Sequence, residues 1–238
     1  MIKYYTRACN FYYGSASKEK IKKKLALPLN GSNLISFDSI EIINRKNKKK
    51  IHISEIKKQS NKIKKKLKED IKLITRKKRF KGLNFSNSPI IMGIVNLTPD
   101  SFSDGGKYNK NNQGFNRAKY LIKKGSKILD IGGESTRPGA KDIDKSVEWK
   151  RINKTLKKIK KLNKFISLDT RKSWIMEEGI KNNINLINDV SGLSYDDKTV
   201  FVLKKHKVPF VIHHMQGTPK VMQKNPRYKN VLLDIYDF

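Results

Sequence analysis

Two stretches decide the fold: Ile91-Met-Gly-Ile-Val-Asn-Leu-Thr-Pro-Asp-Ser-Phe-Ser-Asp-Gly-Gly106 and Leu129-Asp-Ile-Gly-Gly-Glu-Ser-Thr-Arg-Pro-Gly-Ala140. Each begins as an apolar run of strand length and then becomes a loop of Gly, Pro, Ser, Thr and Asp. Such loops expose backbone N–H groups and hydroxyls, which suit an anionic, phosphate-like ligand. One helix-sized segment separates the two stretches, as in successive strand–helix units of a parallel sheet.

The same rhythm continues from Pro89 onward. Apolar strands are predicted at about 90–95, 127–131, 165–168, 184–187 and 208–212. Helices are predicted between them at about 113–124, 144–162, 172–182 and 196–206. Strands with two apolar faces are typical of a parallel sheet covered by helices. The pattern predicts an α/β fold, a (β/α)8 barrel of which about five strands are visible.

Each predicted strand ends in polar residues. The carboxyl ends of barrel strands form one rim, where active sites are built. Taken singly, these residues have structural explanations, such as a helix cap for Asp169 or Asp189 and a turn for Asn96. Five polar ends in succession favour a functional rim instead. They are Asn96, Asp130, Asp169, Asn188 with Asp189, and His213 with His214.

Residues 1–88 differ from the rest, which makes 89–238 the barrel part. They carry 25 Lys and Arg against 6 Asp and Glu, more than half of the net charge of +33. An aromatic strand is predicted at 4–13, further strands at 34–43 and 51–53, and a lysine-rich helix at 56–74. This pattern predicts a small basic α+β appendage. A basic RNA-binding arm is the alternative, supported only by the aromatic residues at 4–13.

The overall charge is weak support for a nucleic-acid function. Only 9 of the 54 basic residues are Arg, the residue that phosphate recognition favours through bidentate contacts. We therefore attribute the charge to codon composition and expect no nucleic-acid partner. The single cysteine, Cys9, allows no intrachain disulfide and indicates a reducing cytoplasm. No apolar run approaches the ~18 residues of a membrane span, so no membrane partner is expected.

The two loops resemble those of dihydropteroate synthase, and three shorter motifs strengthen the resemblance over about residues 90–238. These are Ile166-Ser-Leu-Asp-Thr170, Ile187-Asn-Asp-Val190 and His214-Met-Gln-Gly217. The resemblance implies a transferase of folate biosynthesis. It would condense 6-hydroxymethyl-7,8-dihydropterin diphosphate with para-aminobenzoate, giving 7,8-dihydropteroate and diphosphate.

The resemblance also implies roles for the matching residues. Asn96 would hold Mg²⁺ with diphosphate and water oxygens, and Phe102 would lie near the aminobenzoate ring. The second loop would contact the diphosphate and the aminobenzoate pocket, and two strand-end residues would read the pterin. The implied catalytic residues are Asn96, Thr136, Arg137, Asp169 and Asn188, and the substrate-binding residues are Phe102, Ser135, Thr136, Arg137, Pro138, Asp169, Asn188 and His213.

His213 departs from the family pattern, which usually has methionine at this position. An imidazole could fill the same volume and stack on the pterin ring. A metal pair with His214 is the alternative, although adjacent strand residues point to opposite faces.

The length also departs from the family. Because a full barrel takes about 250 residues, the chain is expected to be an N-terminal fragment that is inactive alone. The resemblance implies that the full-length parent is a homodimer. Its last segment places Val231, Leu232, Ile235 and Phe238 on one helix face. Two other functions stay open: a related pterin-binding methyltransferase, and a basic RNA-binding protein on an inactive barrel.

Overall fold

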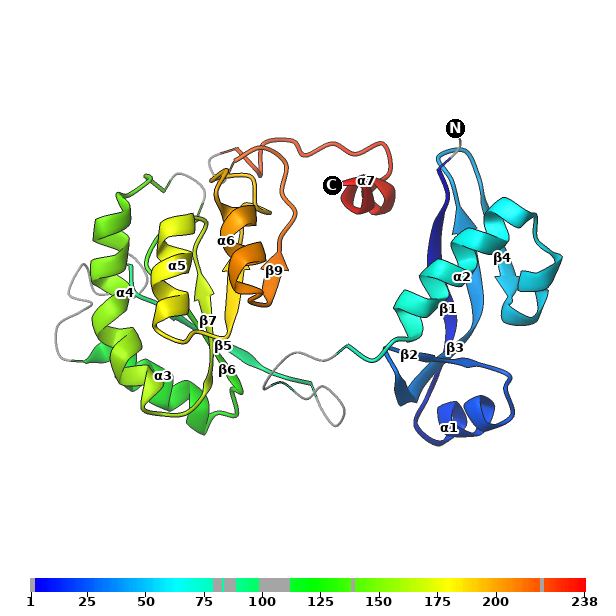
Figure 1. Ribbon diagram of the computed structural model, residues 1–238, viewed down its shortest axis with the longest axis horizontal. Helices are drawn as coiled ribbons and strands as arrows, with labels where there is room; N and C mark the ends of the chain where they lie inside the picture. The colour runs from blue at the N-terminus through cyan, green and yellow to red at the C-terminus, as the bar shows by residue number, and fades with distance from the viewer. Residues whose placement is uncertain (1–2, 79–82, 84–88, 99–111, 138–139, 219–220) are drawn as a thin grey trace. The chain divides into compact units, whose positions relative to one another are not determined.

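The computed structural model describes residues 3–78, 83, 89–98, 112–137, 140–218 and 221–238 (Figure 1). The chain forms two compact units. Unit 1 comprises Met1–Arg79 together with Tyr228–Phe238, and unit 2 comprises Phe80–Arg227. The two units are described separately below.

Unit 2 is built on a five-stranded parallel sheet in the order β5-β6-β7-β8-β9. Because the spatial order follows the chain order, each strand pairs with the next one along the sequence. This confirms the predicted α/β class, the five strands and their incomplete barrel arrangement. The strands are β5 (Met92–Asn96), β6 (Ile128–Gly132), β7 (Phe165–Asp169), β8 (Leu186–Asp189) and β9 (Phe210–Ile212).

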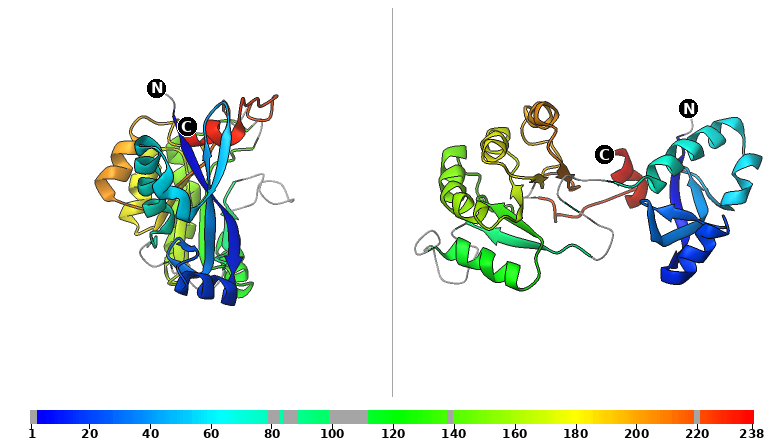
Figure 2. Two further views of the ribbon diagram at one scale, coloured as in Figure 1. Left: turned by 90° about the vertical axis from the view of Figure 1, so that its right-hand side faces the viewer. Right: turned by 60° about the horizontal axis from the view of Figure 1, so that its bottom comes forward.

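Four helices connect these strands and pack along one side of the sheet (Figures 1 and 2). They are α3 (Gln113–Lys123), α4 (Lys145–Lys160), α5 (Ser173–Lys181) and α6 (Thr199–His206). The shared core contains fully buried side chains from both layers, among them Leu129, Leu168, Ile152, Ile175 and Met176. Burial of this apolar area is the main force that holds the helices on the sheet.

The starts of two helices are defined by carboxylate caps. Asp144 caps α4, accepting a hydrogen bond from Ser146 N at 2.7 Å. The first turn of α5 is capped from a different loop, because Ser173 N donates to Asp196 Oδ2 at 2.9 Å. Both carboxylates satisfy backbone N–H groups that have no partner inside the helix.

The other face of the sheet is more open. Ile94 lies two residues before Asn96 and therefore shares its face, and Ile94 is 57% exposed. In the part of the chain that the structure describes, helices α3 to α6 cover only the opposite face.

Unit 1 is an α+β unit with a four-stranded antiparallel sheet, in which β3 pairs with all three other strands. Asn30 and Gly31 both have positive φ, which suits the two-residue turn between β2 and β3. Its elements are β1 (Tyr5–Tyr13), α1 (Gly14–Lys22), β2 (Leu27–Leu29), β3 (Ser32–Ile43), β4 (Lys48–His52), the 3-10 helix η1 (Ile53–Lys58), α2 (Asn61–Thr75) and α7 (Val231–Asp237).

The lysine-rich helix predicted at 56–74 is two elements. A capping box between His52 and Glu55 begins η1, and the extended backbone of Gln59 separates η1 from α2. Helix α2 buries Leu67 against Phe37, Ile40 and other sheet residues, and its lysines face outward. Neither α1 nor β2 was predicted.

The C-terminal helix α7 packs within unit 1, although it follows the strands of unit 2 in the sequence. Leu233 is 1% exposed and lies against Tyr5 and Ile43. Tyr5 donates to both Asp237 oxygens at 2.7 and 2.9 Å. Lys3, with Tyr5 and Arg45, holds the pKa of the Asp237 carboxyl well below its ordinary value. The predicted apolar face of this helix stays 44–59% exposed.

Candidate active site at the carboxyl ends of the strands

The strand register brings the predicted polar ends into one row. Asn96 pairs with Gly132, Gly132 with Asp169, and Asp169 with Asn188. A Cβ added at Gly132 would lie 3.3 Å from Asp169 Oδ2 and 3.5 Å from Asn96 Oδ1. Because glycine occupies this position, the side chains of Asn96 and Asp169 can face the same small space.

Asn188 is held between two further groups. Its amide nitrogen donates to Asp130 Oδ2 at 3.0 Å, and its amide oxygen lies 2.7 Å from His213 Nε2. Asp130 is 5% exposed, and within the described residues its Oδ1 is buried without a hydrogen-bond partner. Burial raises the pKa of the Asp130 carboxyl, although the neighbouring Ser167 hydroxyl and the bond from Asn188 oppose this effect.

Asp169 has the most strongly shifted acidic group of this row. Burial, followed by the nearby charges of Asp130 and Glu148, raises the pKa of its carboxyl to about 8. Two carboxyl groups that lack a cation between them favour the protonated form of one. Near neutral pH the carboxyl of Asp169 therefore favours its neutral form.

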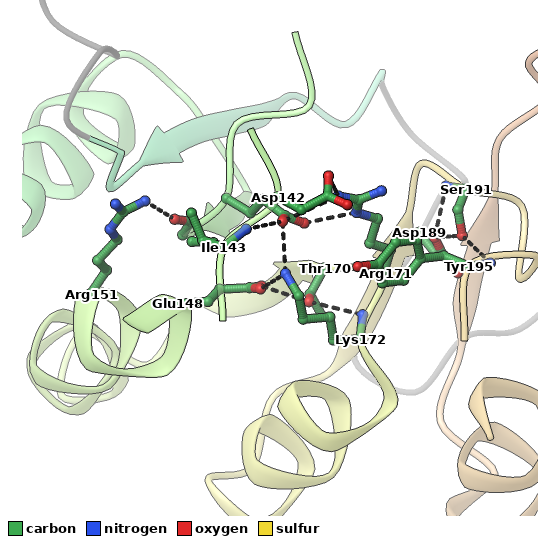
Figure 3. A network of polar contacts seen from close by, with 12 residues as sticks. Asp142, Ile143, Glu148, Arg151, Thr170, Arg171, Lys172, Asp189, Ser191 and Tyr195 are labelled. Atoms are coloured by element: carbon green, nitrogen blue, oxygen red, sulfur yellow. Dashed lines mark hydrogen bonds and ion pairs between the residues drawn. The ribbon is translucent and has the colours of Figure 1, made fainter. Parts of the chain in front are cut away.

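A buried ion-pair network lies behind the second loop (Figure 3). Lys172 Nζ lies 2.7 Å from Glu134 Oε1 and 2.7 Å from Glu148 Oε2. Arg171 makes two hydrogen bonds to Glu134, at 2.8 and 3.2 Å, and one to Asp142 at 2.8 Å. Burial opposes ionisation of Glu134, but Arg171 and Lys172 lower the pKa of its carboxyl below the ordinary value.

This network ties three segments together: the loop after β6, the first turn of α4 and the loop after β7. Two further hydrogen bonds extend it. Arg151 donates to Gly133 O at 2.8 Å, and Thr170 donates to Glu148 Oε1 at 2.7 Å (Figure 3). The Arg171 guanidinium also lies 3.8 Å from the centre of the Tyr195 ring. The network therefore fixes the base of the loop that carries Ser135, Thr136 and Arg137.

The structure places the other predicted residues as follows. Ser135 and Thr136 are half-buried and Arg137 is exposed. Ala140 N donates a hydrogen bond to Arg137 O at 3.0 Å. Phe102 and Pro138 lie outside the described residues.

Asp189 has a structural role, as the capping explanation in the sequence analysis allowed. It accepts from Ser191 N at 2.8 Å, from Ser191 Oγ at 2.7 Å and from Leu193 N at 3.1 Å, so it caps the turn after β8 (Figure 3). It is fully buried.

Four participants were not predicted as site residues: Glu134, Glu148, Arg171 and Lys172. Asp130 was predicted to lie at the rim but was given no role in binding or catalysis, although a carboxylate inside the apolar run Leu129–Gly132 needs a reason. Gly132, two positions after Asp130, lies on the same face of the strand, which places Asp130 on the face of the row. No comparable signal marks Lys172 in a chain this rich in lysine.

In the part of the chain that the structure describes, no three His, Cys, Asp or Glu side chains are grouped as metal ligands. Nor does any helix in that part have the length and apolar character needed to cross a membrane.

Comparison with known families now decides the affiliation. A family model described as "Pterin binding enzyme" matches residues 92–238. The chain belongs to this family. The match spans β5 and everything after it, including the row from Asn96 to Asn188 and the ion-pair network.

Relatives in this family confirm the resemblance read from the loops. Dihydropteroate synthase of Neisseria meningitidis serogroup B is 44% identical over 151 residues, covering 63% of this chain and 53% of the relative. The chain thus spans about half the length of this relative.

Solved structures give the same answer. Yersinia pestis dihydropteroate synthase, in a sulfonamide drug complex, matches with a TM-score of 0.62 and 36% identity, covering 68% of this chain and 59% of that one. The Burkholderia cenocepacia enzyme, complexed with 7,8-dihydropteroate, matches with a TM-score of 0.56 and 32% identity, covering 66% and 52%.

Proposed function

We propose that the protein containing this chain is a dihydropteroate synthase of folate biosynthesis. It would join 6-hydroxymethyl-7,8-dihydropterin diphosphate to para-aminobenzoate and release diphosphate. The observation that carries the proposal is the row of Asn96, Asp169 and Asn188 across neighbouring strands, beside the loop that begins at Gly133. The similarity to dihydropteroate synthases, one of them solved with 7,8-dihydropteroate, supports it.

The pterin would be read by Asp169, Asn188 and Asp130. A carboxylate accepts N–H bonds from the pyrimidine edge of the ring, and an amide both donates and accepts. Asp130 Oδ1 is a buried acceptor that has no partner among the described residues, so a ligand N–H would satisfy it. The raised pKa of Asp169 falls when a donor reaches its carboxylate, because hydrogen bonds to the charged form favour it.

Mg²⁺ fits the oxygen donors of this row. Asn96 supplies a neutral amide oxygen, and the glycine at 132 leaves the space beside it open toward Asp169. Mg²⁺ commonly binds one or two protein oxygens together with waters and phosphate oxygens. Asn96 would hold the ion, which when bound would stabilise negative charge on the leaving diphosphate.

The protein's own contribution is to orient the substrates. Ser135, Thr136 and Arg137 would contact the diphosphate and the aminobenzoate pocket, and the ion-pair network would hold their loop in place. Phe102, near the aminobenzoate ring, Pro138 and His213 complete the proposed substrate contacts. The bond between the pterin methylene and the diphosphate oxygen breaks, and the arylamine nitrogen attacks that carbon. No strong base is required, because an aniline nitrogen is neutral near pH 7.

The proposal extends to the location, the oligomeric state, the partners and the domains of the protein. We propose a cytoplasmic enzyme that acts as a homodimer, with substrates that are small molecules and no nucleic-acid partner. Residues 89–238 would form the partial pterin-binding barrel, and residues 1–88 a basic extension that takes no part in the reaction.

The test is diphosphate release by the protein with its complete barrel. We expect release that requires both the pterin diphosphate and para-aminobenzoate and that stops when Mg²⁺ is chelated. Asp169→Ala should weaken pterin binding by at least ~1.5 kcal/mol, because it removes a charged acceptor from a buried ligand. Absence of diphosphate release by the folded protein would contradict the proposal.

A further inference from the structure

His213 contributes a hydrogen bond that methionine, the residue implied by the family pattern, cannot make. The residue follows β9 and its Nε2 lies 2.7 Å from Asn188 Oδ1. Asn188 in turn reaches across β7 to Asp130 on β6, at 3.0 Å. One chain of hydrogen bonds thus joins the last strand of the sheet to its second strand.

The direction of this chain follows from the chemistry of its members. Asp130 Oδ2 accepts from the Asn188 amide nitrogen, so the nitrogen is the atom of Asn188 that faces Asp130. The amide oxygen therefore faces His213, and because this oxygen only accepts, His213 Nε2 carries the proton. His213 acts as a donor from a side chain that is itself exposed to the open face of the sheet.

After these two hydrogen bonds, the Asn188 amide has one donor and one acceptor left for a ligand. These are one N–H of its nitrogen and one lone pair of its oxygen, held in a fixed order along the rim beside Asp169. Such a pair matches a planar heterocycle that carries an acceptor next to a donor. With methionine at position 213, the orientation of the amide would rest on Asp130 alone.

We propose that His213 is a positioning residue that locks the Asn188 amide in the orientation in which it reads the edge of a pterin ring. This inference rests on the proposed function. In it, His213 contributes to ligand recognition by orienting Asn188, and this role does not depend on stacking against the pterin ring.

Nuclear magnetic resonance of the 238-residue chain, labelled with ¹⁵N in histidine rings and asparagine amides, tests the bond directly. We expect His213 to carry its proton on Nε2, and this signal to change in Asn188→Ala. His52 serves as the internal reference, because it accepts from Ser54 N at 3.2 Å in unit 1. The Asn188 amide signals should shift in His213→Met. A proton on Nδ1 of His213, or unchanged Asn188 signals in His213→Met, would overturn the proposal.

Titration with pterin of the protein that has its complete barrel, followed on the same Asn188 signals, tests the consequence. We expect His213→Met to raise the dissociation constant by about threefold to tenfold, the usual range for one hydrogen bond. His213→Gln keeps an N–H donor and should stay within about twofold of the unchanged protein. Equal affinity in the Met variant would overturn the positioning role. No response of Asn188 to pterin in the unchanged protein with its complete barrel would count against the proposed function, while the position of the His213 proton in the 238-residue chain still decides the bond.

Discussion

Lys172 Nζ lies 2.7 Å from Glu148 Oε2, a carboxylate that is 0% exposed on the first turn of α4. The same ammonium neutralises part of Glu134, so its removal leaves two buried carboxylates with less compensation. Breaking a buried ion pair from one side costs about 3–5 kcal/mol.

Lys172→Met should therefore lower the free energy of unfolding of unit 2 by about 3–5 kcal/mol. The two tryptophans, Trp149 and Trp174, both lie in unit 2, so urea unfolding followed by tryptophan fluorescence reports on this unit. Lys205→Met is the matched control, because its ion pair with Glu177 is solvent-exposed and should contribute less than about 1 kcal/mol. Equal losses in the two variants would contradict the structural role of the network.

The network also shows where sequence reasoning ends. The row of Asn96, Asp169 and Asn188 was predictable, because apolar strands alternating with helices place their carboxyl ends along one edge. Lys172 and Glu148 were not predictable, because nothing local distinguishes a buried lysine from the many solvated ones. Their burial is decided by the approach of the β7–α5 loop to α4, a tertiary contact.

The C-terminal helix shows a second limit. Val231, Leu232, Ile235 and Phe238 are spaced as one apolar helix face, yet Leu233 is the residue that is buried. Periodicity identified the helix correctly but not the surface it uses. Leu233 packs against Tyr5 and Ile43, which are almost the whole chain away in sequence. A local sequence pattern therefore cannot predict this contact.

The pKa of Asp169 predicts a pH dependence of stability. The folded carboxyl has a pKa of about 8 and the ordinary value is 3.8, so between these values the folded state binds a proton that the unfolded state has lost. Stability from this group is complete below about pH 4 and is lost as the pH rises toward 8. The limiting slope is about 1.4 kcal/mol per pH unit, reduced by the partial solvent contact of the side chain.

Asp169→Asn isolates this contribution, because the amide does not titrate. The difference in unfolding free energy between the unchanged chain and the variant should fall steadily from pH 4 to pH 8. Glu134 and Asp196, whose pKa values are lowered, produce the opposite trend in both proteins and cancel in the difference. A difference that does not vary with pH would show that Asp169 titrates normally.

The adjacent glycines Gly132, at the end of β6, and Gly133, at the start of the second loop, should respond differently to alanine. A Cβ at Gly133 would lie 2.9 Å from Glu148 O and 2.8 Å from Ile152 Cγ1, against a packed helix backbone. Gly133→Ala should cost about 1–3 kcal/mol of stability through overpacking. The nearest atoms that Gly132→Ala meets belong to the side chains of Asp169 and Asn96, at 3.3 Å or more, and it should cost less than about 1 kcal/mol. Urea unfolding compares the two, and equal losses would show that α4 yields to the extra methyl group.

Leu233 provides the test that α7 belongs to the core of unit 1. Leu233→Ala removes a side chain that is 1% exposed between Tyr5 and Ile43, and such truncations cost about 2–5 kcal/mol. Leu232→Ala, one residue away and 45% exposed, is the matched control and should cost less than about 1 kcal/mol. Because both tryptophans lie in unit 2, hydrogen exchange of the β1 and β3 amides is the measurement that resolves unit 1. We expect faster exchange at these strands in Leu233→Ala and little change in Leu232→Ala. Unchanged protection of β1 in Leu233→Ala would mean that unit 1 does not depend on the C-terminal helix.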